Sequence, residues 1–351
     1  VVIGGGFGGL YFAKKIKSAD FEITLIDRRN HHLFQPLLYQ VATGGLSPGD
    51  IAYPIRSALS SKKNIRFVQD EVVNFSAEDK SVITKNGKYV YDMLIVAAGT
   101  GNSYFGNDSW EKNAPGLKSI EDALKMRSKI LYPLEKAEIE SDAEKQKALM
   151  TYVVIGGGPT GVELCGAIAE MTKTTLKGSF RSIQSEQARI ILVEAGNRIL
   201  AGFSEKLSEK ALNNLKKLGV EVLLNTKVTQ IESDFVEIQK DGKREKIITE
   251  SVLWGAGVKS SNLVLRLQEQ FKCLVDKQGR VQVNSSLQID SEHSVYVIGD
   301  IAHVKDARTG KPLAGIAPVA MQQGAYLAKF AHKLVKSETV KPFVYWDRGS
   351  L

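Results

Sequence analysis

A glycine-rich turn occurs twice in this chain, and the repeat limits the possible folds more than any other feature of the sequence. Residues 1–9 read VVIGGGFGG and residues 153–161 read VVIGGGPTG, so the first glycine, Gly4, recurs 152 positions later as Gly156. Each copy has an apolar run typical of a buried strand, then the spacing Gly-x-Gly-x-x-Gly, then a helical stretch. Two such units predict two domains of one design, and the length of 351 residues suits about two domains of roughly 150 residues.

Each copy continues with a strand that ends in an acid, a hairpin turn and an apolar strand that closes on glycine. These features lie at Asp27, 86–87 and 94–99 in the first copy and at Glu194, 241–242 and 252–257 in the second. The Asn-Gly and Asp-Gly pairs of the hairpins predict type I′ turns. Strands that are apolar throughout and alternate with helices predict parallel sheets covered on both sides. We therefore expect an α/β fold of two doubly wound, Rossmann-like dinucleotide-binding domains.

A third strand motif lies beyond the second copy. Residues 296–300 read YVIGD and have no glycine-rich turn of their own. The natural use of this strand is to return the chain to the first sheet. Gly299 would then pass close to a ligand, and the Asp300 carboxylate would accept hydrogen bonds from a sugar or ribityl hydroxyl group. A simple Gly-Asp turn without a ligand is the alternative interpretation.

The return strand implies that one domain interrupts the other. Charged residues 117–148 predict a solvated pair of helices that leads into the second domain. We expect the second domain, residues 116–284, to be inserted into the first, which would comprise residues 1–115 and 285–351.

The glycines of the first fingerprint (residues 4–9) and the second fingerprint (residues 156–161) have separate tasks. The first glycine makes the turn, the second lets the backbone approach a pyrophosphate, and the third lets the helix pack closely on the strand. The amino end of the helix then holds the anion. Asp27 and Glu194 are placed to accept hydrogen bonds from ribose hydroxyls, although an acid at a strand end can also serve solubility alone.

Two dinucleotide sites in one chain suggest a flavin and a nicotinamide nucleotide, because hydride has to pass between two bound cofactors. The return strand assigns FAD to the first domain and leaves NADH for the second. The net charge of +8 admits an anionic cofactor, a nucleic acid or an acidic membrane surface, and chooses none of them. A recognition helix or a lysine and aromatic cluster is missing, so we expect no nucleic-acid partner.

Several other classes of protein are disfavoured by what the sequence lacks. No window reaches the roughly 18 uninterrupted apolar residues of a membrane-spanning helix. Cys165 and Cys273 form no CxxC pair, and the adjacent His31 and His32 point in different directions in any regular element, so we expect no metal site. The chain opens without a methionine inside an apolar strand and closes just after a Tyr-Trp-Asp-Arg cluster, so both ends look trimmed.

Two further segments resemble one family closely. Residues 30–42 read NHHLFQPLLYQVA and residues 317–324 read APVAMQQG. With the fingerprints and residues 296–300, they resemble the type II NADH dehydrogenases, which are single-subunit NADH:quinone oxidoreductases among the flavoprotein reductases with two dinucleotide-binding domains. The resemblance covers nearly the whole chain. Two positions depart from it, Pro318, where many members have glutamine, and Arg348, where lysine is common.

This resemblance implies an enzyme that takes hydride from NADH at FAD and passes two electrons to a membrane quinone, ubiquinone or menaquinone, without moving protons across the membrane. It implies a peripheral protein on the cytoplasmic face of a bacterial inner (plasma) membrane and leaves a homodimer open. Membrane-binding C-terminal helices would follow residues 343–350 and are missing from this chain.

Two rival functions are weaker. A soluble NADH reductase of an electron carrier such as ferredoxin or rubredoxin would leave residues 34–42 and 317–324 unexplained. A redox sensor or DNA-binding flavoprotein fits the positive charge but lacks a recognition element.

Three residues are candidates for catalysis. Glu163 follows the second fingerprint in the first turn of a helix, where the helix dipole favours a carboxylate with or without a function. In the family, a glutamate at this place lies near the meeting point of nicotinamide and flavin. Gln322 and Gln323 could donate hydrogen bonds to a quinone carbonyl, or could simply be solvated. Pro318 suits a helix N1 position, so its helix would aim its positive end at the flavin.

The expected cofactor contacts follow from the motifs and the resemblance together. For FAD they are Gly4, Gly6, Phe7, Gly8, Gly9, Asp27, Arg28, Thr43, Val73, Ala98, Gly99, Gly299, Asp300, Ala317 and Pro318. For NADH they are Gly156, Gly158, Pro159, Thr160, Gly161, Glu194, Ala256 and Gly257. Glu194 would repel a 2′-phosphate and favour NADH over NADPH, although Arg198 is close enough in sequence to bind that phosphate.

Overall fold

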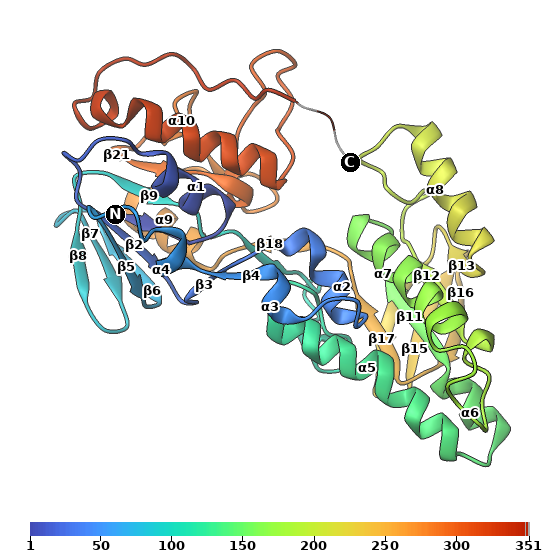
Figure 1. Cartoon of the computed structure of the whole chain (residues 1–351). Coiled ribbons are helices and arrows are strands. Elements are labelled where there is room, and N and C mark those ends of the chain that lie inside the picture. The colour runs from blue at the N-terminus through green and yellow to red at the C-terminus, as the bar shows by residue number, and fades with distance from the viewer. Residues whose placement is uncertain (348, 350–351) are drawn as a thin grey trace. The chain divides into compact units, whose positions relative to one another are not determined.

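A computed structural model describes residues 1–347 and 349, so Arg348, one of the two departures from the family pattern, lies outside the described residues (Figure 1). Contacts divide the chain into two units. The first unit comprises Val1–Leu33, Ala52–Gly101 and Lys259–Leu351, and the second comprises Phe34–Ile51 and Asn102–Val258. These bounds differ from the expected domain bounds at residues 34–51, 102–115 and 259–284. Which nucleotide each unit binds stays a prediction.

The first unit is built on a six-stranded sheet with the order β20-β21-β9-β1-β2-β5. Its strands are β1 (Val2–Ile3), β2 (Ile23–Asp27), β5 (Ile65–Gln69), β9 (Leu94–Val96), β20 (Gln288–Ile289) and β21 (Glu292–Val297). β21 pairs in parallel with β9, with Tyr296 opposite Ile95, and this confirms that the YVIGD strand returns to the first sheet. β20 pairs with β21 in the antiparallel direction, whereas β21, β9, β1, β2 and β5 pair in parallel.

Helices α1 (Phe7–Lys15) and α10 (Ala317–Val335) pack against each other in this unit (Figure 1). A Cβ at Gly324 of α10 would collide with the carbonyl oxygen of Gly8 in α1, so glycine is what lets the two helix backbones approach. α10 buries Leu327, Ala328, Ala331 and Leu334, as its amphipathic sequence predicts. The small elements of the first unit are β3 (His31–Leu33), β4 (Ala52–Pro54), α4 (Ile55–Ala58), β6 (Val72–Ser76), β7 (Ser81–Thr84), β8 (Lys88–Val90), α9 (Leu263–Phe271), β19 (Val281–Gln282), the 3₁₀ turn Gly299–Ile301 and β22 (Ala302–His303).

The second unit is built on a four-stranded parallel sheet with the order β13-β12-β11-β17. Its strands are β11 (Thr151–Ile155), β12 (Arg189–Val193), β13 (Val220–Leu223) and β17 (Ser251–Trp254). An antiparallel sheet follows, made of β14 (Lys227–Ile231), β15 (Phe235–Lys240) and β16 (Lys243–Ile248). The helices are α2 (Leu38–Ala42), α3 (Pro48–Ile51), α5 (Ile120–Ile139), α6 (Ala143–Leu149), α7 (Pro159–Glu170) and α8 (Glu205–Lys217), with short helical turns at Gln35–Leu37, Asp108–Lys112, Met171–Thr175 and Ser185–Gln187.

The predicted helix pair of residues 117–148 is confirmed as α5 and α6. Ser119 caps α5 by accepting a hydrogen bond from the Asp122 amide, and Asp142 caps α6 through the amides of Glu144 and Lys145. Two short strands, β10 (Thr100–Asn102) and β18 (Val258–Ser260), pair with each other. Both doubly wound, Rossmann-like sheets predicted from the repeat are therefore present.

The predicted type I′ turn is confirmed at Asp241-Gly242 and is wrong at Asn86-Gly87. Asp241 and Gly242 both have positive φ, at 50° and 78°, as a type I′ turn requires. Asn86 and Gly87 do not have positive φ. The Thr84 hydroxyl closes that turn through the backbone of Gly87 instead, and the Asn86 amide donates a hydrogen bond to Asp70, so tertiary contacts decide this turn.

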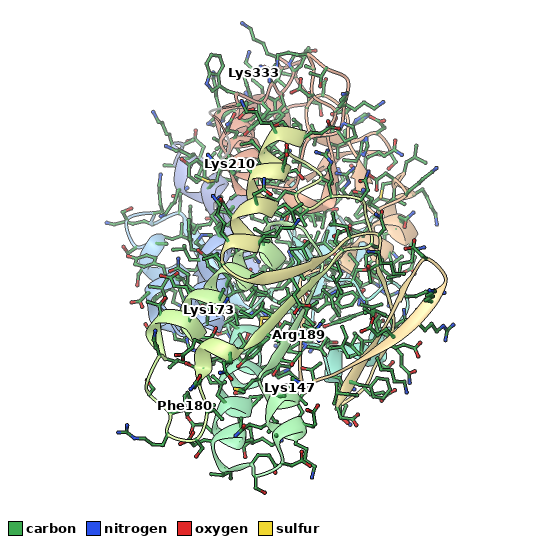
Figure 2. The ribbon with its side chains drawn as sticks, turned by 90° about the vertical axis from the view of Figure 1, so that its right-hand side faces the viewer. Lys147, Lys173, Phe180, Arg189, Lys210 and Lys333 are labelled. Carbon is green, nitrogen blue, oxygen red and sulfur yellow. The ribbon has the colours of Figure 1, made fainter. Side chains whose placement is uncertain are left out.

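The cores and surfaces of the two units follow the sequence pattern. Each sheet is apolar on its buried strands, with fully buried Leu25 and Ile95 in the first unit and Tyr152 and Leu192 in the second. Cationic side chains such as Lys147, Arg189 and Lys210 lie on the exterior of the second unit (Figure 2). Among the described residues, no helix combines the length and the apolar character needed to cross a bilayer.

The third glycine of each fingerprint should be intolerant of any side chain. In the second unit, a Cβ at Gly161 would collide with the carbonyl oxygen of Gly156, which belongs to the backbone and cannot rotate away. We expect Gly161→Ala to destabilise the protein by about 3 kcal/mol and to lower Tm by roughly 5–10 °C, measured by circular dichroism. Gly158→Ala is the matched control, because a Cβ there meets no atom within 4 Å. An unchanged Tm for Gly161→Ala would contradict this account of the turn.

Candidate functional site

The first glycine of each fingerprint makes the turn that the sequence predicts. Gly4 has φ +99° and Gly156 has φ +103°, conformations that residues with side chains rarely adopt. A Cβ at Gly4 would also collide with the carbonyl oxygen of Ala97, and one at Gly156 would come within 2.8 Å of Ala256. In each unit, the chain that follows the closing apolar strand (β9 or β17) therefore lies against the first glycine of the fingerprint. Two predicted cofactor residues, Ala98 and Ala256, lie in these segments.

The second glycine of each fingerprint faces open space, because a Cβ at Gly6 or Gly158 would meet no atom within 4 Å. Gly6 is the N-cap of α1 and Gly158 is the N-cap of α7, and neither helix has a side chain that caps its first turn. The amides of a first helical turn have no partner within the helix and suit an anion. Both loops thus fit the pyrophosphate of a dinucleotide in shape and in hydrogen-bonding chemistry.

Asp27 and Glu194 hold the glycine loops directly, which the sequence did not predict. The Gly5 amide donates to Asp27 Oδ2 at 2.6 Å, and the Gly157 amide donates to Glu194 Oε2 at 2.6 Å. The other oxygen of each acid accepts a second backbone amide, that of Arg29 at 2.8 Å or that of Gly196 at 2.6 Å. Since a carboxylate oxygen can accept two hydrogen bonds, both acids keep capacity for ribose hydroxyls.

The remaining predicted FAD residues fall into both units. Gly99 follows β9 with φ +65°, and Gly299 follows the return strand with φ +74°. Asp300 lies beside Gly315, where a Cβ would come within 3.3 Å of its carboxylate. Val73 is 39% exposed on β6, so a ligand can reach it. Thr43 ends α2 and belongs to the second unit, whereas Phe7, Gly8, Gly9, Arg28, Ala317 and Pro318 belong to the first.

Glu163 is the fifth residue of α7, not part of its first turn as expected, because the helix begins at Pro159. Its carboxylate has no hydrogen-bond or ion-pair partner among the described residues. Water reaches the side chain, which is exposed, yet enough protein surrounds the carboxyl group to weaken its hydration, and this burial raises the pKa of Glu163 to about 7. A carboxyl group that titrates near neutral pH can hold or release a proton under working conditions.

Gln322 and Gln323 are both engaged in bonds to the backbone. Gln322 donates to the carbonyl oxygen of Trp346 and accepts from its amide, each at 2.9 Å. Gln323 is 1% exposed, and its Oε1 accepts a hydrogen bond from the Gly299 amide at 2.7 Å. Pro318 is the second residue of α10 rather than the first, where its missing N–H still costs no helical bond. A contact of either glutamine with quinone stays a prediction.

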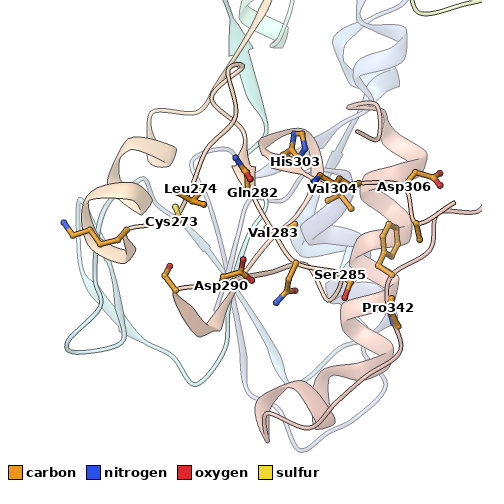
Figure 3. A pocket seen from close by; sticks show the side chains of 16 residues that line it. Cys273, Leu274, Gln282, Val283, Ser285, Asp290, His303, Val304, Asp306 and Pro342 are labelled. Atoms are coloured by element: carbon orange, nitrogen blue, oxygen red, sulfur yellow. The ribbon is translucent and has the colours of Figure 1, made fainter. Parts of the chain in front are cut away.

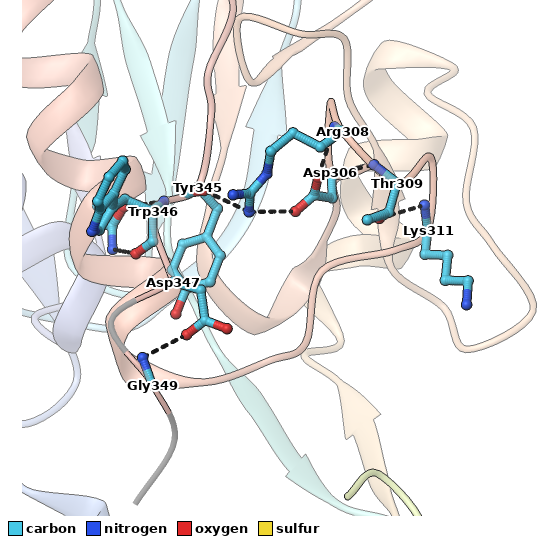
Figure 4. A network of polar contacts seen from close by, with 9 residues as sticks. Asp306, Arg308, Thr309, Lys311, Tyr345, Trp346, Asp347 and Gly349 are labelled. Carbon is cyan, nitrogen blue, oxygen red and sulfur yellow. Dashed lines mark hydrogen bonds and ion pairs between the residues drawn. The ribbon is translucent and has the colours of Figure 1, made fainter. Parts of the chain in front are cut away.

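The C-terminal segment, residues 341–347, is held to the first unit by several such bonds (Figure 4). Besides the two bonds between Gln322 and Trp346, Arg308 donates to the carbonyl oxygen of Tyr345 at 3.1 Å and pairs with Asp306 at 3.2 Å. The segment alternates between buried and exposed side chains, since Tyr345 is 8% exposed and Trp346 is 70% exposed.

The comparisons with known proteins agree on one family. The pattern described as pyridine nucleotide-disulphide oxidoreductase matches residues 1–324. Type II NADH:quinone oxidoreductase Ndh of Mycobacterium tuberculosis is 43% identical over all of this chain and 76% of its own length. The chain belongs to the pyridine nucleotide-disulphide oxidoreductases and, within them, to the type II NADH:quinone oxidoreductases.

Two more distant proteins show the same pattern. Type II NADH:quinone oxidoreductase of Staphylococcus aureus is 30% identical over all of this chain and 86% of its own length. The solved structure of NDH2 from Plasmodium falciparum in complex with NADH has a TM-score of 0.89 at 24% identity, and the match covers 99% of this chain and 86% of that one. This structure shares the fold of the present type II oxidoreductase.

Disulphide chemistry, which part of the family's name describes, finds no support in the cysteines of this type II oxidoreductase. Cys165 and Cys273 are both unpaired and buried. Burial raises the pKa of both thiols, that of Cys273 to about 11, so neither supplies a thiolate at neutral pH. Within the described residues, no group of three or more His, Cys, Asp and Glu side chains is arranged to hold a metal ion.

A cavity of about 500 Å³ lies in the first unit (Figure 3). Cys273, Gln282, Asp290, His303 and Phe343 are among the residues that line it. None of its lining residues is a predicted cofactor or catalytic residue, so the cavity and the fingerprint are separate features of this unit.

The raised pKa of Glu163 predicts a pH-dependent effect on stability. With a pKa of about 7 in the folded protein and about 4.5 in the unfolded chain, the folded state binds more protons between these values. This contribution is fully present below about pH 4.5 and is lost as the pH rises toward 7. We expect Glu163→Gln to gain Tm relative to the wild type as the pH rises from 4.5 to 7, and to gain nothing more above 8. A Tm difference that is constant with pH in differential scanning calorimetry would disprove the shift.

Proposed function

We propose that this type II NADH:quinone oxidoreductase binds FAD with its first unit and NADH with its second. The observation that carries the proposal is the repeated glycine loop, which is open at Gly6 and Gly158 and is held by an acid in each unit. When bound, FAD supplies the chemistry that joins hydride transfer from NADH to two-electron reduction of a quinone. We also propose that no protons are pumped, as membership of the type II enzymes implies.

The chain's own residues would supply binding, orientation and a titratable group. The amides at the amino ends of α1 and α7 would hold the two pyrophosphates, and Asp300 would accept from the ribityl chain. The positive end of α10, which begins at Ala317, would favour negative charge near it. Glu163, with its pKa of about 7, would hold or release a proton next to the nicotinamide.

A quinone could bind at the start of α10 only if it replaced hydrogen bonds that are already present there. Pro318 offers no side-chain donor, and both ends of the Gln322 amide are bound to the Trp346 backbone. A quinone carbonyl could be bound by Gln322 only if it replaced that backbone contact. Gln323 would support the quinone site without touching the quinone, because its buried Oε1 accepts a hydrogen bond from the Gly299 amide.

We propose a peripheral position on the cytoplasmic face of a bacterial membrane. The Mycobacterium tuberculosis and Staphylococcus aureus relatives are bacterial, and the net charge of +8 suits an acidic membrane surface. A homodimer stays open as the oligomeric state.

Rapid-mixing kinetics on the FAD-loaded full chain would test the function and the role of Glu163 together. We expect NADH to reduce the bound flavin and ubiquinone or menaquinone to reoxidise it. Glu163→Gln should slow quinone-dependent turnover by about 10²-fold or more, because loss of a positioned acid–base group has effects of this size. Its FAD content should match that of the wild type. Turnover with a ferredoxin or rubredoxin but not with quinones would favour the electron-carrier alternative, and two unchanged half-reactions would leave Glu163 without a catalytic role.

NADH should be preferred over NADPH because the second unit presents a negative charge where the adenosine ribose is expected. Glu194 would repel a 2′-phosphate, and Arg198 cannot easily offset this, since its guanidinium donates to the carbonyl oxygens of Ala201 at 2.8 Å and Phe203 at 3.0 Å. We expect kcat/KM for NADH to exceed that for NADPH by about 100-fold, and Glu194→Gln to reduce this ratio at least tenfold. Arg198→Gln is the matched control and should leave the ratio within about twofold. Equal kcat/KM for the two nucleotides in the wild type would contradict the assignment.

A further inference from the structure

Gly5, which lies between the first and second glycines of the first fingerprint, is held at both ends of its backbone. The Gly5 amide donates to Asp27 Oδ2 at 2.6 Å, and the Gly5 carbonyl oxygen lies 3.0 Å from His32 Nδ1. A carbonyl oxygen only accepts hydrogen bonds, so His32 Nδ1 must carry the hydrogen. Side chains therefore hold both the amide and the carbonyl group of Gly5, the residue that precedes the open position at Gly6.

His32 also packs against the residue on the far side of Gly6. Its ring meets the ring of Phe7, the first residue of α1, edge to face at a centroid distance of 4.9 Å and an angle of 90°. Burial, foremost, lowers the pKa of His32, which favours the neutral ring at pH 7. The charged and titratable groups around it are Lys14, Asp27 and His31. His32 thus contacts the loop on both sides of the glycine at which a pyrophosphate would approach.

The second fingerprint shows that the carbonyl contact is a recurring part of the loop. The Gly157 amide donates to Glu194 Oε2 at 2.6 Å, as Gly5 does to Asp27. The Gly157 carbonyl oxygen accepts a hydrogen bond at 2.7 Å, but from the backbone amide of Leu200. The two loops therefore satisfy the same pair of backbone groups, and only the first loop uses a side chain for the carbonyl.

We propose that His32 is a positioning residue for FAD, which holds the Gly5 peptide so that the first-turn amides of α1 stay aimed at the pyrophosphate. The inference rests on the proposed binding of FAD by the first unit. It separates the two loops functionally, because one side-chain substitution would loosen the flavin loop and leave the NADH loop intact.

Three substitutions isolate the hydrogen bond from the packing of the ring. His32→Phe keeps an aromatic ring beside Phe7 and removes the donor. His32→Asn removes the ring and places an amide nitrogen at the same distance along the side chain as Nδ1, so it can restore the bond. His31→Phe is the matched control, because the neighbouring ring bonds only to the Asn30 side chain in the described structure.

The measurement is the Kd of FAD for the flavin-stripped full chain, followed by the fluorescence of free flavin, together with the Kd of NADH and the Tm of the stripped protein. We expect His32→Phe to weaken FAD binding about five- to tenfold, which is the effect of losing one ordinary hydrogen bond. His32→Asn and His31→Phe should stay within about twofold of the wild type, with NADH binding unchanged throughout.

The other possible results distinguish a failure of the proposed function from a failure of the role proposed for His32. If the wild-type chain does not bind FAD, the proposed function itself fails. If the wild type binds FAD and His32→Phe binds it equally well, His32 positions nothing. Equal losses in His32→Phe, His32→Asn and His31→Phe, or a parallel loss of NADH binding and Tm, would also overturn the inference, because they would mark a general packing defect.

Discussion

Both halves of this molecule depend on one close approach of backbone to backbone. The carbonyl oxygen of the first fingerprint glycine lies where a Cβ of the third would be, for Gly4 and Gly9 in one unit and for Gly156 and Gly161 in the other. This approach puts the amino end of a helix directly above the end of a parallel strand. First-turn amides, which have no partner within their own helix, then lie in one small region with an open loop and the acid of the neighbouring strand. The backbone geometry alone therefore makes this region suitable for an anion, whichever side chains surround it.

The loops also need to be held, and each unit does so with the end of the next strand. An acid at the end of β2 or just after β12 reaches back to the amide of Gly5 or Gly157. The residue that is expected to meet a ribose therefore also shapes the loop that is expected to hold the pyrophosphate. The same charge that would select NADH therefore has a structural task. The carbonyl of that glycine is satisfied differently in the two units, by a side chain in one and by backbone in the other. A duplicated fold can thus be stable in the same way while its two loops respond differently to substitution.

The sequence was most informative where short-range sterics decide the structure. The fingerprints, the helix pair and the return strand at Tyr296 could be predicted, because glycine spacing and apolar runs act locally. Contacts between residues far apart in the sequence determine the features that could not be predicted. The turn at Asn86 departs from type I′ because its side chain reaches Asp70. Residues 34–51 join the second unit because α2 packs on α5 and α7, and Arg127 binds the carbonyl oxygen of Leu46 at 2.9 Å. No local pattern in the sequence encodes these partners.

α10 shows why the candidate site could be located from sequence although its details could not. Its sequence indicates an amphipathic helix with small residues near its start, and the structure uses Gly324 to bring it onto α1 beside Gly8. One residue earlier, buried Gln323 holds the Gly299 turn. Gln322, which precedes Gln323, holds the C-terminal segment by two hydrogen bonds to the backbone of Trp346. Three consecutive residues thus tie the first fingerprint, the return strand and the C-terminal segment to one rigid helix. A displacement of α10 would therefore reach all three elements at once.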